Sequence, residues 1–455
     1  MIQHVMGEQA QQSSTWDSPI RYVVRPLRVK TPLMKLLQYG ADQPRMFWQN
    51  AAVSTAYAAW GVVKSIQASG PDRFEAVREG AWGLLPQHDH EIAPVDTAPR
   101  LFGGFAFSPD PNDDPYWTQF DAAKFILPRV MITDTNGQLW LTVSSPVDGP
   151  AEDLASVADR WVQRIERGEL PDVSVAAKNR RVTYPLMREQ WVEQVSRGIG
   201  LIRDGVLEKI VLSRVADLVS DSAVDPVAAL ASLEHAYPAT YRFMFEPMPG
   251  HAFLGATPEL LLEVMGRVLR TAAVAGSAAR GATPAEDAAL AAELFTSPKE
   301  RHEHALVADA VRDLLEPISD MLSFPDEPQI MRLGNIQHLF TPFTGHLADE
   351  VDILEVVLRL HPTPALGGYP ADAAVAAIRD IELFDRGWYA APIGWLDASG
   401  GGMFAVAIRS AVVNGDHARL YAGCGIVEQS DPLREWDETR IKFRPMLDAL
   451  GACES

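Results

Sequence analysis

Two carboxylates and a lysine near the end of the sequence have a spacing that can do chemistry. Asp431-Pro432 predicts the start of a helix, because aspartate caps helix N-termini and proline fits the first turn. On that helix Glu435, Glu438 and Lys442 fall at i, i+3 and i+7, which places them on one face. Carboxylates that leave positions for water and substrate oxygens suit Mg2+ better than zinc. The alternative is an exposed, ion-paired helix face.

A third carboxylate, Glu303, is predicted to face the interior of the protein. It shares a helical stripe with Val307, Ala310, Val311 and Leu314. A buried carboxylate needs a partner, which makes Glu303 a candidate metal ligand. The adjacent His302 and His304 are not candidates, because side chains at i and i+2 of a helix point about 200° apart and cannot share a metal.

Lys209 and Glu259 are candidates for proton transfer. Lys209 lies in the apolar run VLEKIVLSRVADL, which predicts a strand. As a base it would need a pKa lowered from about 10.4 towards roughly 7 to 8; the alternative is an edge-strand lysine whose ammonium reaches solvent. Glu259 follows Pro258 after the small-residue stretch LGAT, and its alternative is a loop carboxylate on the surface.

The elements that must carry these residues indicate an α+β fold. Trp191, Val195 and Ile199 recur at helical spacing, and Gly205 is a stop signal for that helix. Asn136-Gly137 and Met265-Gly266 predict hairpin turns. Two further helices are predicted to begin with a proline after a capping residue, each with a glutamate that completes a capping box, at Thr283-Pro284 with Glu286 and at Ser297-Pro298 with Glu300.

Composition excludes several classes of protein. The 455 residues include 60 acidic and 40 basic side chains, a formal net charge of -20, so neither a nucleic acid nor an anionic membrane is expected as a partner. There is no apolar run of membrane-spanning length and no signal peptide at the start. Two cysteines, Cys424 and Cys453, cannot build a disulfide framework, and we expect a cytoplasmic protein. Walker A, G-x-S-x-G and convincing G-x-G-x-x-G motifs are missing.

Three regions are predicted along the chain. Residues 1–18 are polar and expected to be disordered. Residues 19–170 form an N-terminal subdomain with antiparallel strands, and residues 186–450 form the catalytic region. The charges, glycine and prolines between Arg164 and Leu186 mark the junction.

Many separate motifs, in one order over residues 190–450, resemble the chorismate-utilising enzyme family. They are EKIVLSR, FLGATPELLLE, AGSAARG, SPKERHEHALVADAV, LGNIQHLFTPFTG, HPTPALGG, RGWYAAPIGW, FAVAIRSA and AGCGIVEQSDPLREWDETRIK. Lys209 and HPTPALGG are most similar to the isochorismate synthase branch, in which chorismate becomes isochorismate without net redox change. The resemblance implies a chorismate-binding fold of two facing antiparallel sheets flanked by helices.

The resemblance also implies a role for each candidate residue. Lys209 resembles the base that activates water for attack at ring carbon 2, and Glu259 the acid that protonates the hydroxyl leaving ring carbon 4. Glu303 and Glu438 resemble direct Mg2+ ligands, with Glu435 acting through water. The implied substrate-binding residues are Gly276, Ser277, His338, Ala365, Tyr389, Arg409, Gly423, Gly425 and Lys442. Met403 stands where relatives of this branch often have an acidic residue.

Three functions compete with isochorismate synthesis. A salicylate synthase would share these residues and then eliminate pyruvate, whereas an ammonia-using synthase would pair with a glutaminase subunit. Lys209 and HPTPALGG argue against the glutaminase partner, and the third alternative is an interaction protein without catalysis. We expect a monomer. The product could feed menaquinone or a siderophore, and the long N-terminal region favours menaquinone.

Overall fold

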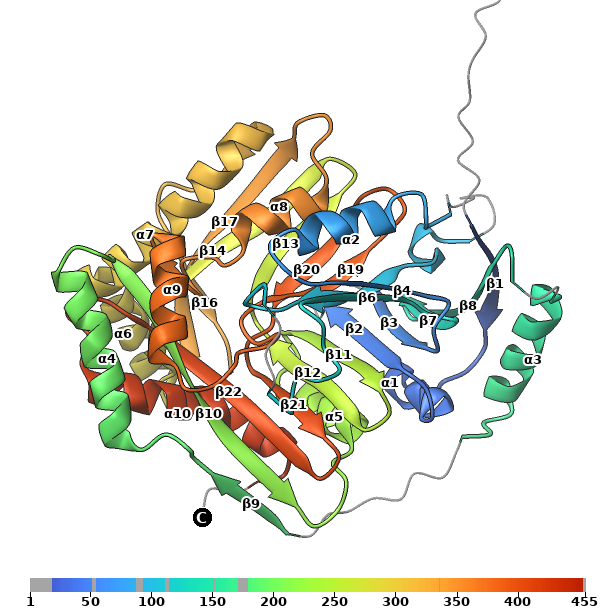
Figure 1. Ribbon diagram of the computed structural model, residues 1–455, viewed down its shortest axis with the longest axis horizontal. Helices are drawn as coiled ribbons and strands as arrows, with labels where there is room; N and C mark the ends of the chain where they lie inside the picture. Colours follow the sequence, from blue (N-terminus) through green and yellow to red (C-terminus); the bar gives the residue numbers. More distant parts are fainter. Residues whose placement is uncertain are drawn as a thin grey trace, which may run out of the picture.

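The computed structural model describes residues 19–50, 55–86, 93–110, 114–149, 152–170, 179–334 and 336–452. The predicted disorder of residues 1–18 lies outside this part of the chain. Within it, all strands belong to two antiparallel sheets with helices around them (Figure 1). The predicted α+β class with two sheets is confirmed.

The first sheet has twelve strands within the described residues. In spatial order they are β1 (Ile20–Leu27), β8 (Gln138–Pro146), β7 (Val130–Thr135), β3 (Thr55–Trp60), β2 (Arg45–Asn50), β11 (Tyr241–Met248), β12 (His251–Thr257), β21 (Ser410–Asn414), β22 (His417–Ile426), β10 (Lys209–Ser220) and β18 (Gly368–Tyr369), with β9 (Arg180–Thr183) also on β10. Strands from before α3 (Leu154–Glu166) and from after α4 (Arg188–Arg203) meet in this sheet where β2 pairs with β11.

The second sheet has ten strands within the same part of the chain. Its order is β15 (Ser319–Ser323), β17 (Ile336–Leu347), β14 (Val268–Ala279), β13 (Leu260–Met265), β20 (Gly402–Val406), β19 (Pro392–Leu396), β5 (Leu101–Phe105), β6 (Ala123–Leu127) and β4 (Lys64–Ala68), with β16 (Gln329–Arg332) also on β17. Again the two parts of the sequence meet inside the sheet, where β5 pairs with β19.

Helices and short 3-10 turns cover these sheets. They are α1 (Leu33–Leu36), α2 (Arg73–Ala81), α3 (Leu154–Glu166), α4 (Arg188–Arg203), α5 (Pro226–Ala236), α6 (Pro284–Thr296), α7 (Pro298–Leu315), α8 (Ile353–Leu360), α9 (Ala371–Ile381), α10 (Pro432–Ala449), η1 (Leu37–Gly40), η2 (Val95–Thr97) and η3 (Glu316–Ile318). Helix α7 packs on β14 and α10 packs on β22, so the two helices that carry the candidate carboxylates lie on different sheets. No helix of the described residues is long and apolar enough to cross a membrane.

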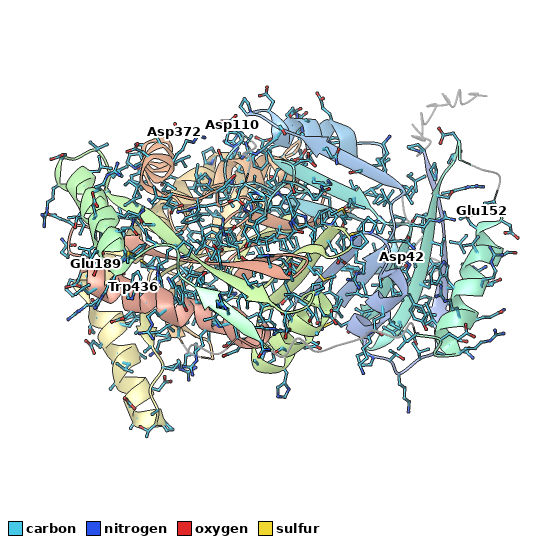
Figure 2. All side chains as sticks on the ribbon, turned by 60° about the horizontal axis from the view of Figure 1, so that its bottom comes forward. Asp42, Asp110, Glu152, Glu189, Asp372 and Trp436 are labelled. Atoms are coloured by element: carbon cyan, nitrogen blue, oxygen red, sulfur yellow. The ribbon has the colours of Figure 1, made fainter. Side chains whose placement is uncertain are left out.

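Local sequence signals explain several of these boundaries. Asn136 and Gly137 both have positive φ, as the turn between β7 and β8 requires. Gly205 has a φ of 72° just after α4, so the predicted helix stop is confirmed. Asp110 and Glu189 are exposed and lie at separate edges of the molecule in Figure 2.

Of the two hydrogen bonds that define each predicted capping box, only the one accepted by the capping hydroxyl is present. The hydroxyls of Thr283 and Ser297 accept from the amides of Glu286 and Glu300, at 3.2 and 3.4 Å. The carboxylates of Glu286 and Glu300, however, accept from other amides than those of the capping residues. Glu286 accepts from the Ala282 amide, and Glu300 accepts from the amide of Ser277 at 3.0 Å. The reason is tertiary: a bulge in β14 at Gly276 brings another amide within reach of Glu300.

Candidate active site

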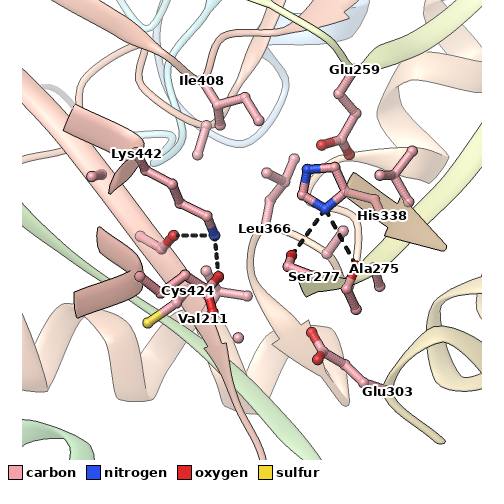
Figure 3. A pocket seen from close by; sticks show the side chains of 18 of the residues that line it. Val211, Glu259, Ala275, Ser277, Glu303, His338, Leu366, Ile408, Cys424 and Lys442 are labelled. Atoms are coloured by element: carbon pink, nitrogen blue, oxygen red, sulfur yellow. Dashed lines mark hydrogen bonds and ion pairs between the residues drawn. The ribbon is translucent and has the colours of Figure 1, made fainter. Parts of the chain in front are cut away.

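A cavity lies between the sheets, and α7 and α10 contribute to its walls. Its walls come from β10 and β22 of the first sheet, β14 and β17 of the second, both helices and several loops. All fourteen residues predicted for the site line it: Lys209, Glu259, Gly276, Ser277, Glu303, His338, Ala365, Tyr389, Arg409, Gly423, Gly425, Glu435, Glu438 and Lys442. In Figure 3 the Glu259 carboxylate lies beside the His338 ring, with Lys442 across the cavity.

Lys209 and Glu303 form an ion pair inside this cavity. The Lys209 Nζ lies 2.9 Å from the Glu303 Oε1, and their side chains are only 1% and 12% exposed. The edge-strand alternative for Lys209 is therefore wrong: β10 has β22 on one side and β18 on the other, and the ammonium does not reach solvent. The sequence predicts that a buried carboxylate at Glu303 needs a partner, and in the structure this partner is Lys209.

Gly425 of β22 makes room for the pair. Gly423 and Gly425 lie opposite Ser213 and Val211 in the antiparallel register, on the face of β10 that carries Lys209. A Cβ at Gly425 would lie 2.5 Å from the Glu303 Oε1 and 2.8 Å from the Lys209 Cε. Only glycine permits the lysine and the carboxylate to approach the strand this closely.

Glu259 is buried, so its surface-loop alternative is wrong. The residue lies between β12 and β13 and is 8% exposed. Burial raises the pKa of its carboxyl to about 7, although the charges of Lys209, Lys442 and Arg409 act in the opposite direction. Near neutral pH the group therefore divides between acid and carboxylate.

Helix α10 presents Glu435, Glu438 and Lys442 to the cavity as its spacing predicts, so the exposed-face alternative is wrong. Lys442 Nζ lies 2.6 Å from the Glu438 Oε1. Burial, followed by the charge of Glu438, raises the pKa of Glu435 to about 7. Burial alone would raise the pKa of Glu438 as well, but the Lys442 ammonium holds it below its ordinary value.

Three further polar residues that line the cavity, Arg409, Tyr389 and His338, are also buried. Arg409 has a φ of 50° and is 7% exposed, and burial lowers the pKa of its guanidinium. Beside it, Tyr389 stacks on Tyr421 with ring centroids 5.0 Å apart. His338 Nδ1 lies 2.9 Å from the Ser277 Oγ, and burial lowers the pKa of this histidine to about 3, which keeps it neutral.

A family model described as "Chorismate binding enzyme" matches residues 8–451. The chain belongs to the chorismate-binding enzyme family. It is 37% identical over 437 residues to the salicylate biosynthesis isochorismate synthase of Pseudomonas aeruginosa, covering 92% of this chain and 88% of that one. It is 36% identical to the isochorismate synthase MenF of Bacillus subtilis, covering 92% and 91%. MenF of Escherichia coli, a menaquinone-specific isochorismate synthase of known structure, superposes with a TM-score of 0.79 at 25% identity over 95% of both chains.

Sequence reasoning missed two charged residues of this chorismate-binding enzyme. Glu300 and Lys299 both line the cavity, and Lys299 Nζ lies 3.5 Å from Glu300 and 3.4 Å from Glu435. The signal for Glu300 was present, since it lies at i-3 from Glu303 on the same helix face. Its assignment to a capping box concealed it.

Met403 and Cys424 of this chorismate-binding enzyme are both buried. Met403 is buried in β20, opposite Trp395 and Glu263, and is not among the cavity-lining residues. Cys424 does line the cavity, but burial raises the pKa of its thiol far above its ordinary value. A thiol held protonated is a poor nucleophile, so Cys424 acts as a small buried side chain in the cavity wall.

Proposed function

We propose that this protein is an isochorismate synthase that adds water at ring carbon 2 of chorismate and removes the hydroxyl at ring carbon 4. The observation that carries the proposal is the enclosure of Lys209 and Glu259, a potential base and a potential acid, in one cavity with a set of glutamates and an unsolvated arginine. The two isochorismate synthases that match over 92% of the chain support the same reaction.

In this proposal Glu259 is the general acid. A leaving hydroxyl needs a proton, and a carboxyl with a pKa of about 7 can donate one near neutral pH. Lys209 is the general base that takes a proton from the attacking water. Its Nζ contacts the Glu303 Oε1, so Glu303 must move away before a water can take that position beside the lysine.

We propose Mg2+ as the cofactor, with Glu303 and Glu438 as direct ligands and Glu435 acting through water. The donors are of the right chemical type, because Mg2+ prefers carboxylate oxygens and water. In the described residues no three acidic, histidine or cysteine side chains are close enough to share an ion as they stand. Lys209, Lys299 and Lys442 neutralise these carboxylates instead. Bound there, the ion would supply positive charge for a substrate carboxylate.

The substrate is a dianion, and the chain's own groups can hold it. Arg409 offers a planar fork for one carboxylate, with the Tyr389 hydroxyl nearby. Lys442 is fixed by its contacts with Glu438 and with the Gly423 carbonyl, at 2.8 Å. The backbone at Gly276 and Ser277 and the neutral His338 add donors and acceptors without charge. We further propose a monomer that needs no glutaminase subunit and serves menaquinone synthesis.

Incubation of the pure protein with chorismate and Mg2+, followed by chromatography, tests the function. We expect isochorismate as the product and an equilibrium approached from either side. Fluorescent salicylate and pyruvate without a second enzyme would favour the salicylate synthase alternative, and an aminated product that requires an ammonia source would favour the ammonia-using synthase. If chorismate stays unchanged at all Mg2+ concentrations, the proposal is wrong.

A further inference from the structure

A buried arginine and glutamate outside the predicted site contact the backbone behind several cavity walls. Glu382 follows α9, and Arg386 begins the RGWYAAPIGW motif. The two side chains are each 2% exposed, and the guanidinium meets the carboxylate at two positions, Nη2 to Oε1 at 2.6 Å and Nε to Oε2 at 2.9 Å. A bidentate pair of this kind fixes both side chains in one orientation.

The pair replaces a missing strand beside β10. One side of β10 pairs with β22 along its length. On the other side, β18 pairs only with Lys209 and Ile210, and β9 pairs only from Asp217 onwards. In the gap, the Arg386 Nη2 donates to the Val211 carbonyl at 2.8 Å. The Ser213 amide in turn donates to the Glu382 Oε1 at 2.7 Å. Buried backbone groups need such partners, so the ion pair holds the segment that follows Lys209.

Arg386 also reaches two other walls, one through its guanidinium and one through its backbone. Its Nη1 donates to the Leu366 carbonyl at 2.9 Å, beside Ala365 in the HPTPALGG loop. The Arg386 carbonyl accepts from the Tyr389 amide at 2.8 Å. Val211, Ala365, Leu366 and Tyr389 all line the cavity. Figure 3 places Val211 and Leu366 on its wall.

The N-terminal part of the chain closes this arrangement from outside. The Arg386 Cζ lies 4.3 Å from the centroid of the Phe107 ring, and the Phe107 amide donates to the Gly387 carbonyl at 2.7 Å. Trp117 packs against Gly387 and donates to the Tyr421 hydroxyl at 3.0 Å. The region before β6 therefore supports the segment that carries Arg386 and Tyr389.

We propose that Arg386 is a positioning residue for the reaction: through Glu382 it sets the relative placement of β10, the Ala365–Leu366 loop and Tyr389 around the substrate. The inference rests on the proposed function, since the activity that it affects is the conversion of chorismate. Its mechanism is geometric, because two hydrogen bonds hold the pair together and three more join it to wall segments that are distant in the sequence.

The experiment compares Arg386→Lys with Arg45→Lys. Arg45 and Glu246 form a second buried bidentate pair, with side chains 9% and 0% exposed, between β2 and β11, and neither residue lines the cavity. Lysine keeps the charge in both pairs but loses the fork. We expect similar falls in Tm, whereas only Arg386→Lys should lower kcat/KM, by at least about tenfold.

Amide hydrogen exchange provides a readout that does not depend on activity. We expect amides in residues 210–214 to exchange faster in Arg386→Lys and unchanged in Arg45→Lys. Equal kcat/KM in the two variants, or unchanged exchange at 210–214, would overturn the inference. If Arg386→Lys does not fold, Glu382→Met with Arg386→Met removes both buried charges together and is measured in the same way. A wild-type protein that makes no isochorismate contradicts the proposed function, while the exchange comparison still decides the role of Arg386.

Discussion

At the scale of single residues, the two groups proposed for proton transfer differ in what surrounds them. Lys209 has a carboxylate 2.9 Å away, whereas burial is the main cause that raises the pKa of Glu259. Glu259 is therefore the group whose protonation should change near neutral pH. Three predictions follow from this contrast and from the glycine beside Lys209.

Removal of either group should abolish most of the activity. Lys209→Ala and Glu259→Ala should each lower turnover on the order of 10² to 10⁴, the range for a positioned proton-transfer group. In the wild type, activity should decline as pH rises above about 7, because Glu259 then loses the proton that it donates. Steady-state rates against pH are the measurement, with the exposed Lys64 changed to Ala as control. Wild-type turnover in Lys209→Ala with the same pH profile would show that another group activates the water.

Glu259 should also affect stability in a pH-dependent way. Its pKa is about 7 in the folded protein and about 4.5 when unfolded, so the folded state retains a proton that the unfolded state has lost. Stability should therefore be lost as pH rises through this window, by up to about 3 kcal/mol. Glu259→Gln should remove this dependence. Denaturant unfolding of both proteins at pH 5 and pH 8 measures it, and an equal pH response in the two would contradict the burial argument.

Gly425→Ala should disturb the Lys209 and Glu303 pair, since the new methyl group would lie within 3 Å of both side chains. We expect a fall in kcat/KM on the order of 10- to 100-fold from misplacement of these groups. Gly200→Ala in α4 is the matched control, because nothing lies within 4 Å of the added atom there. Equal activity in the two variants would show that Gly425 does not set the geometry of the pair.

At the scale of elements, α7 and α10 bring their carboxylates together from different sheets. Each helix has a side-chain cap and a proline in its first turn, which fixes its start and hence the direction of the side chains that follow. The Asp431 carboxylate accepts from two amides at the start of α10, at 2.8 and 3.1 Å. Spacing along α10 thus determines which residues face the cavity.

Glu438→Gln should raise the Mg2+ concentration needed for half-maximal activity by at least about tenfold, because it keeps the shape of a proposed ligand and removes its charge. Asp437→Asn is the control, since Asp437 is exposed on the same helix and does not line the cavity. Activity against Mg2+ concentration, with chelator as the zero point, is the measurement. An unchanged Mg2+ requirement in Glu438→Gln would remove Glu438 from the ligand set.

At the scale of the whole molecule, the polypeptide crosses between the two sheets repeatedly. Strands before residue 147 and strands after residue 240 pair directly in both sheets, at β2 with β11 and at β5 with β19. One core cluster contains Phe105, Phe253 and Trp388, from widely separated parts of the chain. The sheets therefore do not separate along the sequence boundary near residue 170.

We expect a single cooperative unfolding transition for the described fold. Because neither part of the chain can complete a sheet alone, circular dichroism and tryptophan fluorescence should give coincident denaturation curves. Cleavage between residues 170 and 186 should not release two independently folded parts. Two resolved transitions, with the first leaving half of the secondary structure, would show that the N-terminal subdomain folds by itself.

The sequence alone was sufficient for the local features and for the names of many residues that line the cavity. Helix starts at Asp431 and Ser297, the turn at Asn136-Gly137 and the single face shared by Glu435, Glu438 and Lys442 depend on neighbours a few residues away, and each is confirmed. The family motifs named further residues that line the cavity, but not Lys299 or Glu300. Short-range rules work here because caps, turns and helical spacing act within one or two turns of chain.

Only the tertiary structure decided the partners of these residues. The ion pair of Lys209 with Glu303, the diversion of Glu300 to Ser277 and the burial that raises the pKa of Glu259 all depend on contacts between segments distant in the sequence. Arg386 is the clearest case, because its role follows from a gap beside β10 that no local pattern reveals. Burial and long-range pairing are properties of the packed sheets, and the free energy of a charge depends on that packing.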